Sequence, residues 1–183
     1  MANRQKKKSG LSFAWRWFLI LVIILLAAVG WWLKPESEDA KNLTARLQTI
    51  VIEQTGEKSN MDKERIVDIS VSQVSAAWNA ELVLNADKGR TNISTKQFMW
   101  QQAIAILAPL SELPELNDVS ISWVYPVVGP NDKVTDQSVM SFRLDKITRD
   151  QLIWENVEPS LLPDIALDYE EHSVLDKSQQ PKR

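Results

Sequence analysis

The chain has 183 residues, no cysteine and a formal net charge of −3 at pH 7. This small net charge hides a sharp division. Residues 1–33 carry five basic residues and no acid, whereas residues 34–183 carry 16 basic and 24 acidic residues, a net charge of −8. An acidic body argues against nucleic-acid binding, which relies on clustered lysine and arginine. The lack of cysteine excludes disulfides and thiolate metal sites.

Residues 17–33 form an apolar run of 17 residues without a charge, at the lower end of the roughly 17–25 residues that span a bilayer as a helix. Indole rings and long basic side chains favour the headgroup region on either side of such a run. The expected membrane-interface residues are Trp15, Arg16, Trp17, Trp31, Trp32 and Lys34. The basic excess before the run predicts a cytoplasmic tail over residues 1–16. We therefore expect a single-pass protein of the cell membrane whose C-terminal domain is extracellular.

The same segment also fits a cleaved signal peptide, with a basic start, an apolar core and small residues at Ala28–Gly30 as the cleavage site. Two tryptophans follow that site directly and the apolar run continues through them to Leu33, which favours an uncleaved anchor. If cleavage occurs, the protein is a secreted soluble domain.

The first half of the outer part predicts one helix, two strands and a second helix. Apolar residues recur at helical spacing over residues 38–55, and Gly56 is a typical helix end. Residues 66–72 alternate, with Val67, Ile69 and Val71 expected on one face, and residues 80–86 alternate less cleanly. A capping-box pattern at Ser94–Gln97 predicts the start of the next helix, which Pro109 and Pro114 limit.

The second half predicts two more strands and short helices. Residues 117–125 and 137–144 alternate, and the turn residues between them predict a loop over residues 127–136. A second capping-box pattern at Thr148–Gln151 opens a short helix through Trp154, and a final short helix is expected over residues 164–171. Residues 176–183 are polar and expected to form a flexible tail.

The predicted order is helix-strand-strand-helix-strand-strand, followed by short C-terminal helices. Strands that come in pairs separated by turns favour an antiparallel sheet, with helices on one face. We therefore expect an α+β domain over residues 34–175.

Several aromatic and turn positions carry a resemblance to known proteins. They are the stretches Ile121–Pro126, Ser138–Met140, Ile153–Asn156 and Leu162–Ala166. Through them, residues from about 94 to 175 resemble a group of small uncharacterised extracellular proteins of Gram-positive bacteria, anchored to the membrane by a lipid or by one helix. The resemblance implies an outward location and no catalytic residues. Those proteins tend to have Gly-Asn-Glu where this chain has Gly129–Asp132.

The layout of the chain is also similar to that of the bitopic scaffold subunits of bacterial conjugation and secretion machines. Those subunits combine a short cytoplasmic tail, one helix and a small α+β domain that binds partner proteins.

Two connections are candidate partner-binding surfaces, because loops carry function more often than the elements they join. One is the stretch Val74–Asn79, where Trp78 is expected between two strands, and the other is the 127–136 loop. The candidate residues are Trp78, Val128, Asn131 and Asp132. The expected partner is the lipid bilayer together with another membrane or envelope protein.

A metal-dependent hydrolase anchored at the surface is the alternative. Asp168, Glu171 and His172 are the candidate metal ligands, since Asp168 and His172 are four residues apart and could share a face of a helix. No nucleophile elbow, phosphate-binding loop or zinc-protease motif occurs in the sequence. We therefore assign no catalytic residue and no cofactor, and the sequence favours a binding or scaffold domain.

Overall fold

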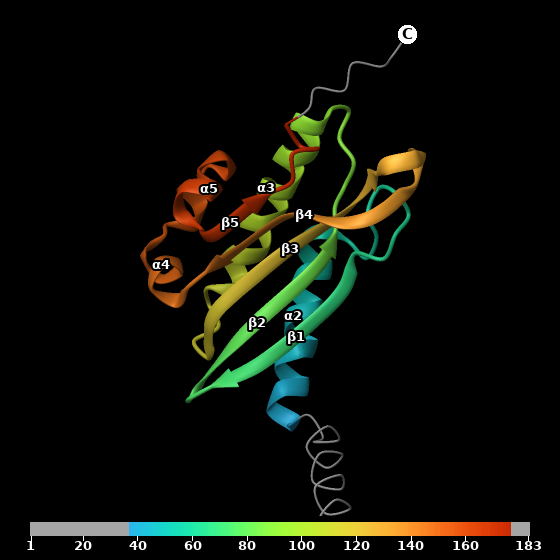
Figure 1. The fold of residues 1–183 in the computed structure, drawn as a ribbon. Helices are drawn as coiled ribbons and strands as arrows, with labels where there is room; N and C mark the ends of the chain where they lie inside the picture. Colours follow the sequence, from blue (N-terminus) through green and yellow to red (C-terminus); the bar gives the residue numbers. More distant parts are fainter. Residues whose placement is uncertain (1–36, 177–183) are drawn as a thin grey trace, which may run out of the picture. The chain divides into compact units, whose positions relative to one another are not determined.

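The computed structural model describes residues 37–176. They form an α+β domain built on one five-stranded sheet with the strand order β1-β2-β3-β4-β5 (Figure 1). The strands are β1 (Ile66–Val74), β2 (Ala77–Asn85), β3 (Leu116–Val128), β4 (Val134–Leu144) and β5 (Leu167–Glu171). The helices are α2 (Glu38–Thr55), α3 (Asn92–Leu110), α4 (Lys146–Gln151) and α5 (Leu162–Ile165), with 3₁₀ turns η1 (Pro130–Asp132), η2 (Trp154–Asn156) and η3 (Pro159–Leu161).

The sheet is mixed, so the expectation of an antiparallel sheet is wrong at one position. The strand pairs β1–β2, β3–β4 and β4–β5 are antiparallel, whereas β2 and β3 run parallel. The reason is the connection: β2 and β3 are joined through α3, and a crossover helix returns the chain to the same end of the sheet. The helix-strand-strand order is confirmed for both halves, which share one sheet.

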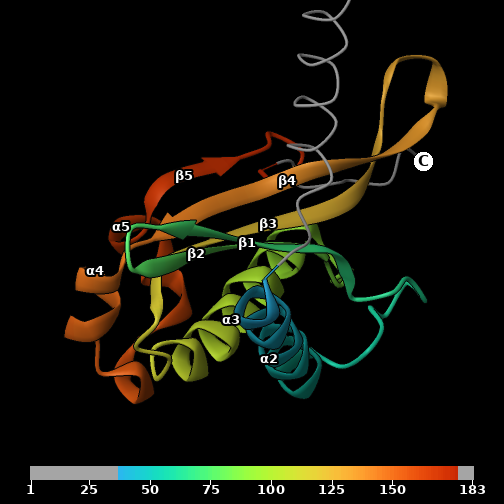
Figure 2. The same ribbon diagram turned by 90° about the horizontal axis from the view of Figure 1, so that it is seen from below.

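The two long helices, α2 and α3, lie together on one face of the sheet (Figure 2). Helix α2 has the predicted bounds and ends at Gly56, whose φ of 80° suits glycine. The core lies between these helices and the inward faces of β2, β3 and β4. Its largest members include Leu47, Leu82, Leu84, Met99, Ile106, Leu107, Leu110, Ile121 and Trp123.

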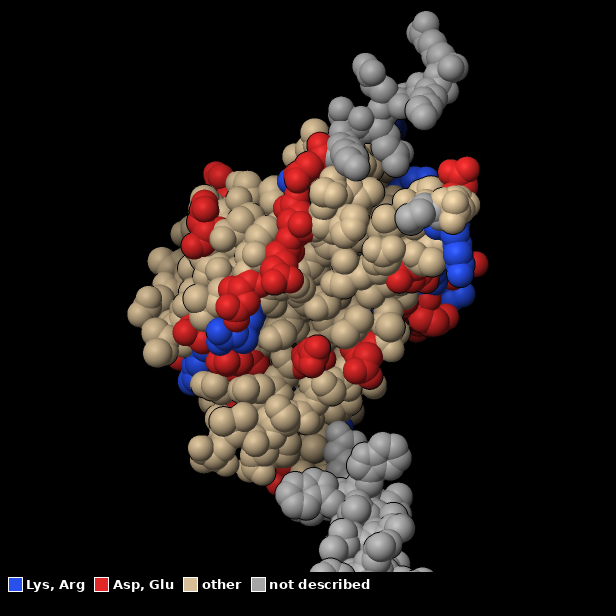
Figure 3. Space-filling view, in the orientation of Figure 1, with Lys and Arg blue, Asp and Glu red and all other residues tan. Residues whose placement is uncertain are grey.

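The opposite face of the sheet is polar. In Figure 3, acidic side chains follow β5 across this face, where Asp168 and Glu170 are exposed. Serine side chains of β1 and β3 lie beside Asp118 and Arg143 on the same face. Arg143 donates hydrogen bonds of 2.9 Å to both Asp118 and Asp168, and so joins β3, β4 and β5 on this open side.

Both predicted capping boxes lie three residues too late in the chain. Helix α3 is capped by Thr91, whose hydroxyl accepts from the Ser94 backbone N–H at 3.1 Å, while Ser94 Oγ accepts from the Thr91 N–H at 2.9 Å. Helix α4 is capped by Asp145, whose carboxylate accepts from the Thr148 N–H at 2.8 Å. Each residue expected as a cap therefore lies in the first turn and contacts the true cap.

The final helix expected over residues 164–171 is wrong. Helix α5 has only four residues, and the chain then forms β5 along β4. Asp168 has a positive φ of 53° and lies at a register shift between β4 and β5. A second register shift explains why Val67 does not share a face with Ile69 and Val71 as predicted. A bulge between Ile66 and Asp68 leaves Val67 exposed, whereas Ile69 and Val71 pack on the core.

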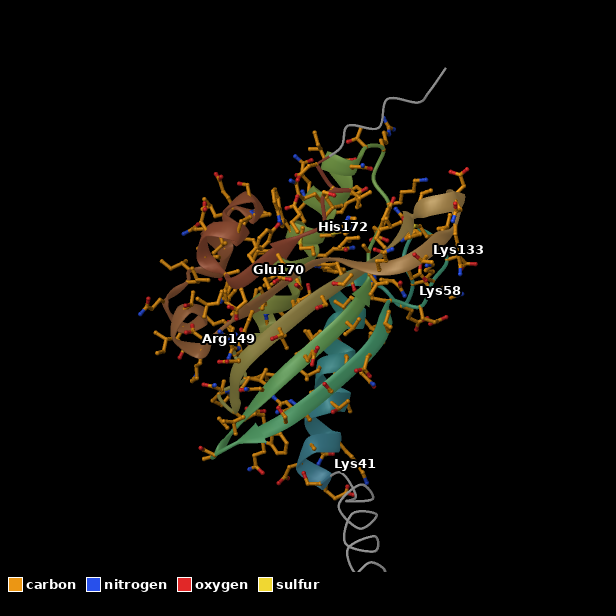
Figure 4. The ribbon with its side chains drawn as sticks, viewed as in Figure 1. Lys41, Lys58, Lys133, Arg149, Glu170 and His172 are labelled. Atoms are coloured by element: carbon orange, nitrogen blue, oxygen red, sulfur yellow. The ribbon has the colours of Figure 1, made fainter. Side chains whose placement is uncertain are left out.

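Two buried arginines, one at each end of the sheet, hold the connections to it. Arg65 donates to the backbone oxygens of Asn85 (2.6 Å), Thr55 (3.1 Å) and Lys58 (3.1 Å) and to the Asp87 carboxylate (2.9 Å). Arg149 of α4, labelled in Figure 4, joins the last turn of α3 to the start of β3. Backbone oxygens that would otherwise be buried without a donor are thereby satisfied.

Candidate functional site

The feature of the domain that extends furthest from its core is the hairpin of β3 and β4. Strand β2 pairs with β3 only as far as Val124, and β5 pairs with β4 only from Met140 onward. Beyond these points β3 and β4 pair only with each other, over four residue pairs from Tyr125–Gln137 to Val128–Val134. We call residues 125–137 the β3–β4 arm. It appears in Figure 1 as the orange hairpin at the upper right.

The arm replaces the loop expected over residues 127–136. The strands continue to Val128 and from Val134, so only residues 129–133 connect them. The Gly129 N–H donates to the Lys133 carbonyl at 2.8 Å and closes the turn. Asn131 and Asp132 both have positive φ, 65° and 57°, a conformation that asparagine and aspartate adopt more readily than most residues.

The end of the arm carries two exposed apolar side chains. Val128 is 61% exposed and Val134 is 58% exposed. They are directly opposed across the hairpin, so their side chains lie on the same face of the arm. Asn131, Asp132 and Lys133 are exposed beside them. The tip therefore presents a small apolar patch next to a carboxylate, an amide and an amine.

The base of the arm is tied to the rest of the domain. Val127 is buried, and Tyr125 packs on the core. On one side, Lys63 forms an ion pair with Asp136 and links the arm to the 56–65 connection. That connection is itself held by the buried Arg65. Figure 4 shows Lys133 at the tip and Lys58 on the neighbouring connection. The exposed valines are thus carried on a supported hairpin.

Three of the five tip residues are among those predicted from the sequence, and two, Lys133 and Val134, are not. Val128, Asn131 and Asp132 lie at the tip as expected, although Val128 belongs to β3. Val134 was missed because the turn signals around it indicated a loop. The available signal was the β-branched pair Val134-Thr135, which continues the alternation of the return strand backward to the turn.

The expected position of Trp78 in a loop is wrong. Only Ser75 and Ala76 connect β1 and β2, with Ser75 at a φ of 59°, and Trp78 is part of β2. Its side chain is partly buried against the core. Its backbone N–H donates to the Glu115 carbonyl at 2.9 Å. Trp78 is therefore not an exposed loop residue.

The three candidate metal ligands each form a hydrogen bond with a different residue. Asp168 accepts from Arg143 Nε at 2.9 Å, Glu171 accepts from Lys96 Nζ at 2.8 Å, and His172 Nδ1 accepts from the Val174 N–H at 3.1 Å. Figure 4 shows Glu170 and His172 along β5, where the extended backbone replaces the expected helix. Within residues 37–176, no group of three or more histidine, aspartate or glutamate side chains is arranged to hold a metal ion.

A partly buried polar network lies instead between α3 and β5. Trp100 Nε1–H donates to the Tyr169 oxygen at 3.0 Å, and the Tyr169 hydroxyl donates to Glu171 at 2.8 Å. Burial raises the pKa of Tyr169, and the charge of Glu171 raises it further. Burial alone would lower the pKa of Lys96, but the hydrogen bonds and charges of Glu171 and Asp176 outweigh it and the pKa is raised. This network fixes β5 against α3 with both charges paired.

The expected membrane segment is not among the residues that the structure describes. The apolar run 17–33 and its interface residues lie outside the described residues, as does most of the expected tail 176–183. Over residues 37–176, no helix has the length and apolar character needed to cross a bilayer.

Comparison with known proteins found no match. No protein-family model, no curated protein and no solved structure is significantly similar to this chain. The geometry of the domain is therefore the basis for a functional proposal.

Proposed function

We propose that residues 37–176 form a protein-binding domain and that the β3–β4 arm is its contact surface. In this proposal residues 17–33 hold the protein in the cell membrane as a single-pass anchor, and the domain faces outward. The partner is another membrane or envelope protein, and the chain acts as a scaffold subunit of an envelope, conjugation or secretion assembly. No chemical reaction is assigned to it.

The observation that carries this proposal is the opposed pair Val128 and Val134. Burying a valine side chain contributes roughly 1.5–3 kcal/mol relative to leaving it in water. Folding of the domain gains only part of this burial free energy for either valine, since both are more than half exposed. A partner that covers the tip would gain the remaining burial free energy of both valines. The exposed Asp132 and Lys133 beside them supply charges that can select the partner.

The base of the arm supports the same proposal. A binding element that is already ordered loses less conformational entropy when it docks than a flexible loop does. The Lys63–Asp136 ion pair and the buried Val127 hold the base. The hydrolase alternative has no comparable observation in its favour, because Asp168, Glu171 and His172 have separate partners.

The test replaces both tip valines by threonine in the full-length chain. Threonine keeps the β-branched shape that suits a strand and adds a hydroxyl that resists burial. The matched control is Val67→Thr with Val74→Thr on β1, where the two valines are 52% and 49% exposed. Tagged chains are recovered from cross-linked cells, and the proteins bound to each are quantified.

We expect Val128→Thr with Val134→Thr to lower the recovery of a specific membrane or envelope protein by at least about tenfold. The β1 control should recover the same protein at the level of the unchanged chain. Equal recovery by both double variants would exclude the arm as the contact surface. Equal urea midpoints for the two variants establish that any loss is not caused by unfolding.

A further inference from the structure

A second candidate site lies between α3 and the η3 turn, on elements that the arm does not include. It is an open hollow with a volume of about 320 Å³, at the small end of the roughly 300–1,000 Å³ typical of small-molecule sites. Its lining residues are Gln97, Trp100 and Gln101 of α3 and Glu158, Pro159 and Ser160 at η3. The lining therefore combines one indole ring, two amides, one carboxylate and one hydroxyl.

The indole ring in this hollow is held in place by neighbouring side chains. Trp100 Nε1–H donates to Tyr169 at 3.0 Å, and the Lys96 ammonium lies 5.4 Å from the centre of the ring. Lys96 and Tyr169 are in turn fixed by Glu171. Rotation of the ring would break these hydrogen bonds. Trp100 thus offers a rigid aromatic surface, which reduces the entropy lost when a ligand stacks on it.

The polar groups around the ring are free to receive a ligand. Among the interactions of residues 37–176, the side chains of Gln97, Gln101, Glu158 and Ser160 have no hydrogen-bond partner, and all four residues are exposed. Gln97 and Gln101 are four residues apart on α3, so their amides lie on the same face of the helix. Each amide can both donate and accept.

The charged side chains in and near the hollow disfavour anionic ligands. Glu158 is the one charged residue in the lining, and it is acidic. The nearby cation, Lys96, is already paired with Glu171 at 2.8 Å and with Asp176 at 3.3 Å. Phosphates and carboxylates recognised by free lysine or arginine are therefore poor ligands for this hollow. A neutral molecule with hydroxyl or amide groups suits the lining.

We propose that this hollow binds a neutral saccharide. A pyranose ring has an apolar C–H face, which can stack on Trp100, and hydroxyls at its rim, which can bond to Gln97, Gln101 and Glu158. An N-acetylhexosamine fits most fully, because its acetamido N–H can donate to the Glu158 carboxylate and its carbonyl can accept from a glutamine amide. The site does not depend on the arm or on any partner protein.

The experiment titrates the full-length chain with two sugars, the β-linked N-acetylglucosamine trimer and maltotriose. The chain is labelled with ¹⁵N at the tryptophan indoles. It is kept in a detergent that has no sugar headgroup. A Trp100→Phe variant assigns the Trp100 signal. We expect the N-acetylglucosamine trimer to shift that signal to saturation, maltotriose to shift it less, and the buried Trp123 to stay unchanged. No shift of Trp100 with either sugar up to about 10 mM, ten times a weak Kd of about 1 mM, would overturn the proposal.

A surface variant separates binding from folding, because Trp100 itself packs on the core and belongs to the partly buried network. The triple substitution Gln97→Ala, Gln101→Ala and Glu158→Gln changes only exposed side chains. We expect it to weaken the binding of the N-acetylglucosamine trimer by at least about tenfold, as the loss of several hydrogen bonds requires. The control is Gln54→Ala, an exposed glutamine of α2. Equal binding by the triple variant and the control would contradict the proposed site.

Discussion

At the scale of single residues, buried side chains with specific partners hold this fold together. Arg149 is the clearest case. It is 1% exposed and donates to the carbonyls of Leu110 (2.9 Å), Leu116 (2.7 Å) and Asn117 (3.0 Å). Burial lowers the pKa of its guanidinium. No sequence pattern signals this residue, because an arginine in a short polar helix normally indicates a solvated surface.

Replacing Arg149 by alanine should therefore strongly destabilise the domain. It leaves three carbonyl oxygens without this donor and opens a cavity, and we expect a loss of roughly 3–5 kcal/mol in the free energy of unfolding. Urea unfolding of the full-length chain measures this loss. Lys146→Ala, a partly exposed position on the same helix, is the control and should stay within about 0.5 kcal/mol. A similar small effect for both variants would mean that Arg149 does not bind these carbonyls.

The two tyrosines should make the stability of the domain depend on pH in the alkaline range. Burial raises the pKa of both Tyr125 and Tyr169 above the ordinary value of 10.0. The unfolded chain then releases these protons first as pH rises, so their contribution to stability is full below pH 10.0 and is lost above it. Phenolate absorbance should appear at higher pH in the folded chain than in urea. Coincident titration curves would contradict the buried hydroxyls, and Tyr169→Phe should reduce the alkaline loss of stability.

At the scale of elements, periodicity predicted the helices and strands better than their ends and pairing. The apolar spacing of α2 and the alternation of β3 and β4 are local, and local patterns survive folding. The parallel contact of β2 with β3 and the addition of β5 to β4 depend on distant parts of the chain. A capping box starting at Thr91 was missed because Ser94–Gln97 matched the same pattern.

The start of α3 provides a test of this packing. A Cβ added at Gly89 would lie 2.5 Å from the Thr95 backbone nitrogen, closer than real contacts allow. Gly89→Ala should therefore destabilise the domain by roughly 1–3 kcal/mol, since the 89–91 segment must move away from the helix. Gly129→Ala is the matched control: its Cβ would lie 3.4 Å from the Lys133 carbonyl, and φ there is negative. Thermal unfolding of both variants gives the comparison, and equal melting temperatures would exclude the close approach at Gly89.

For the β3–β4 arm, the turn residues were predicted from the sequence but the length of the strands was not. Turn residues pointed to Asn131 and Asp132, and both lie at the tip with positive φ. The sequence did not reveal that the strands on either side extend four residue pairs beyond their neighbours, because the lengths of β2 and β5 decide this. Trp78 was predicted in a loop because the connection between β1 and β2 was expected to be longer. The actual turn has two residues, so Trp78 lies inside β2.

At the scale of the whole molecule, the proposal joins an acidic binding domain to a membrane anchor. It predicts that the mature protein keeps its N-terminus and stays in the membrane fraction, and that external protease removes the domain. The mass of the native protein and its distribution between membrane and medium measure this. A product that begins at Trp31 and is found in the medium would show that residues 17–33 act as a cleaved signal.

Site-specific photo-cross-linking at the tip of the arm in living cells tests whether the arm contacts a partner protein. A photoreactive residue replaces Val128 in one chain and Val74 in another, since both valines are exposed and both lie in strands. We expect a discrete cross-linked adduct with an envelope or membrane protein from position 128 and not from position 74. The same adduct from both positions, or from neither, would contradict the assignment of the β3–β4 arm as the partner contact.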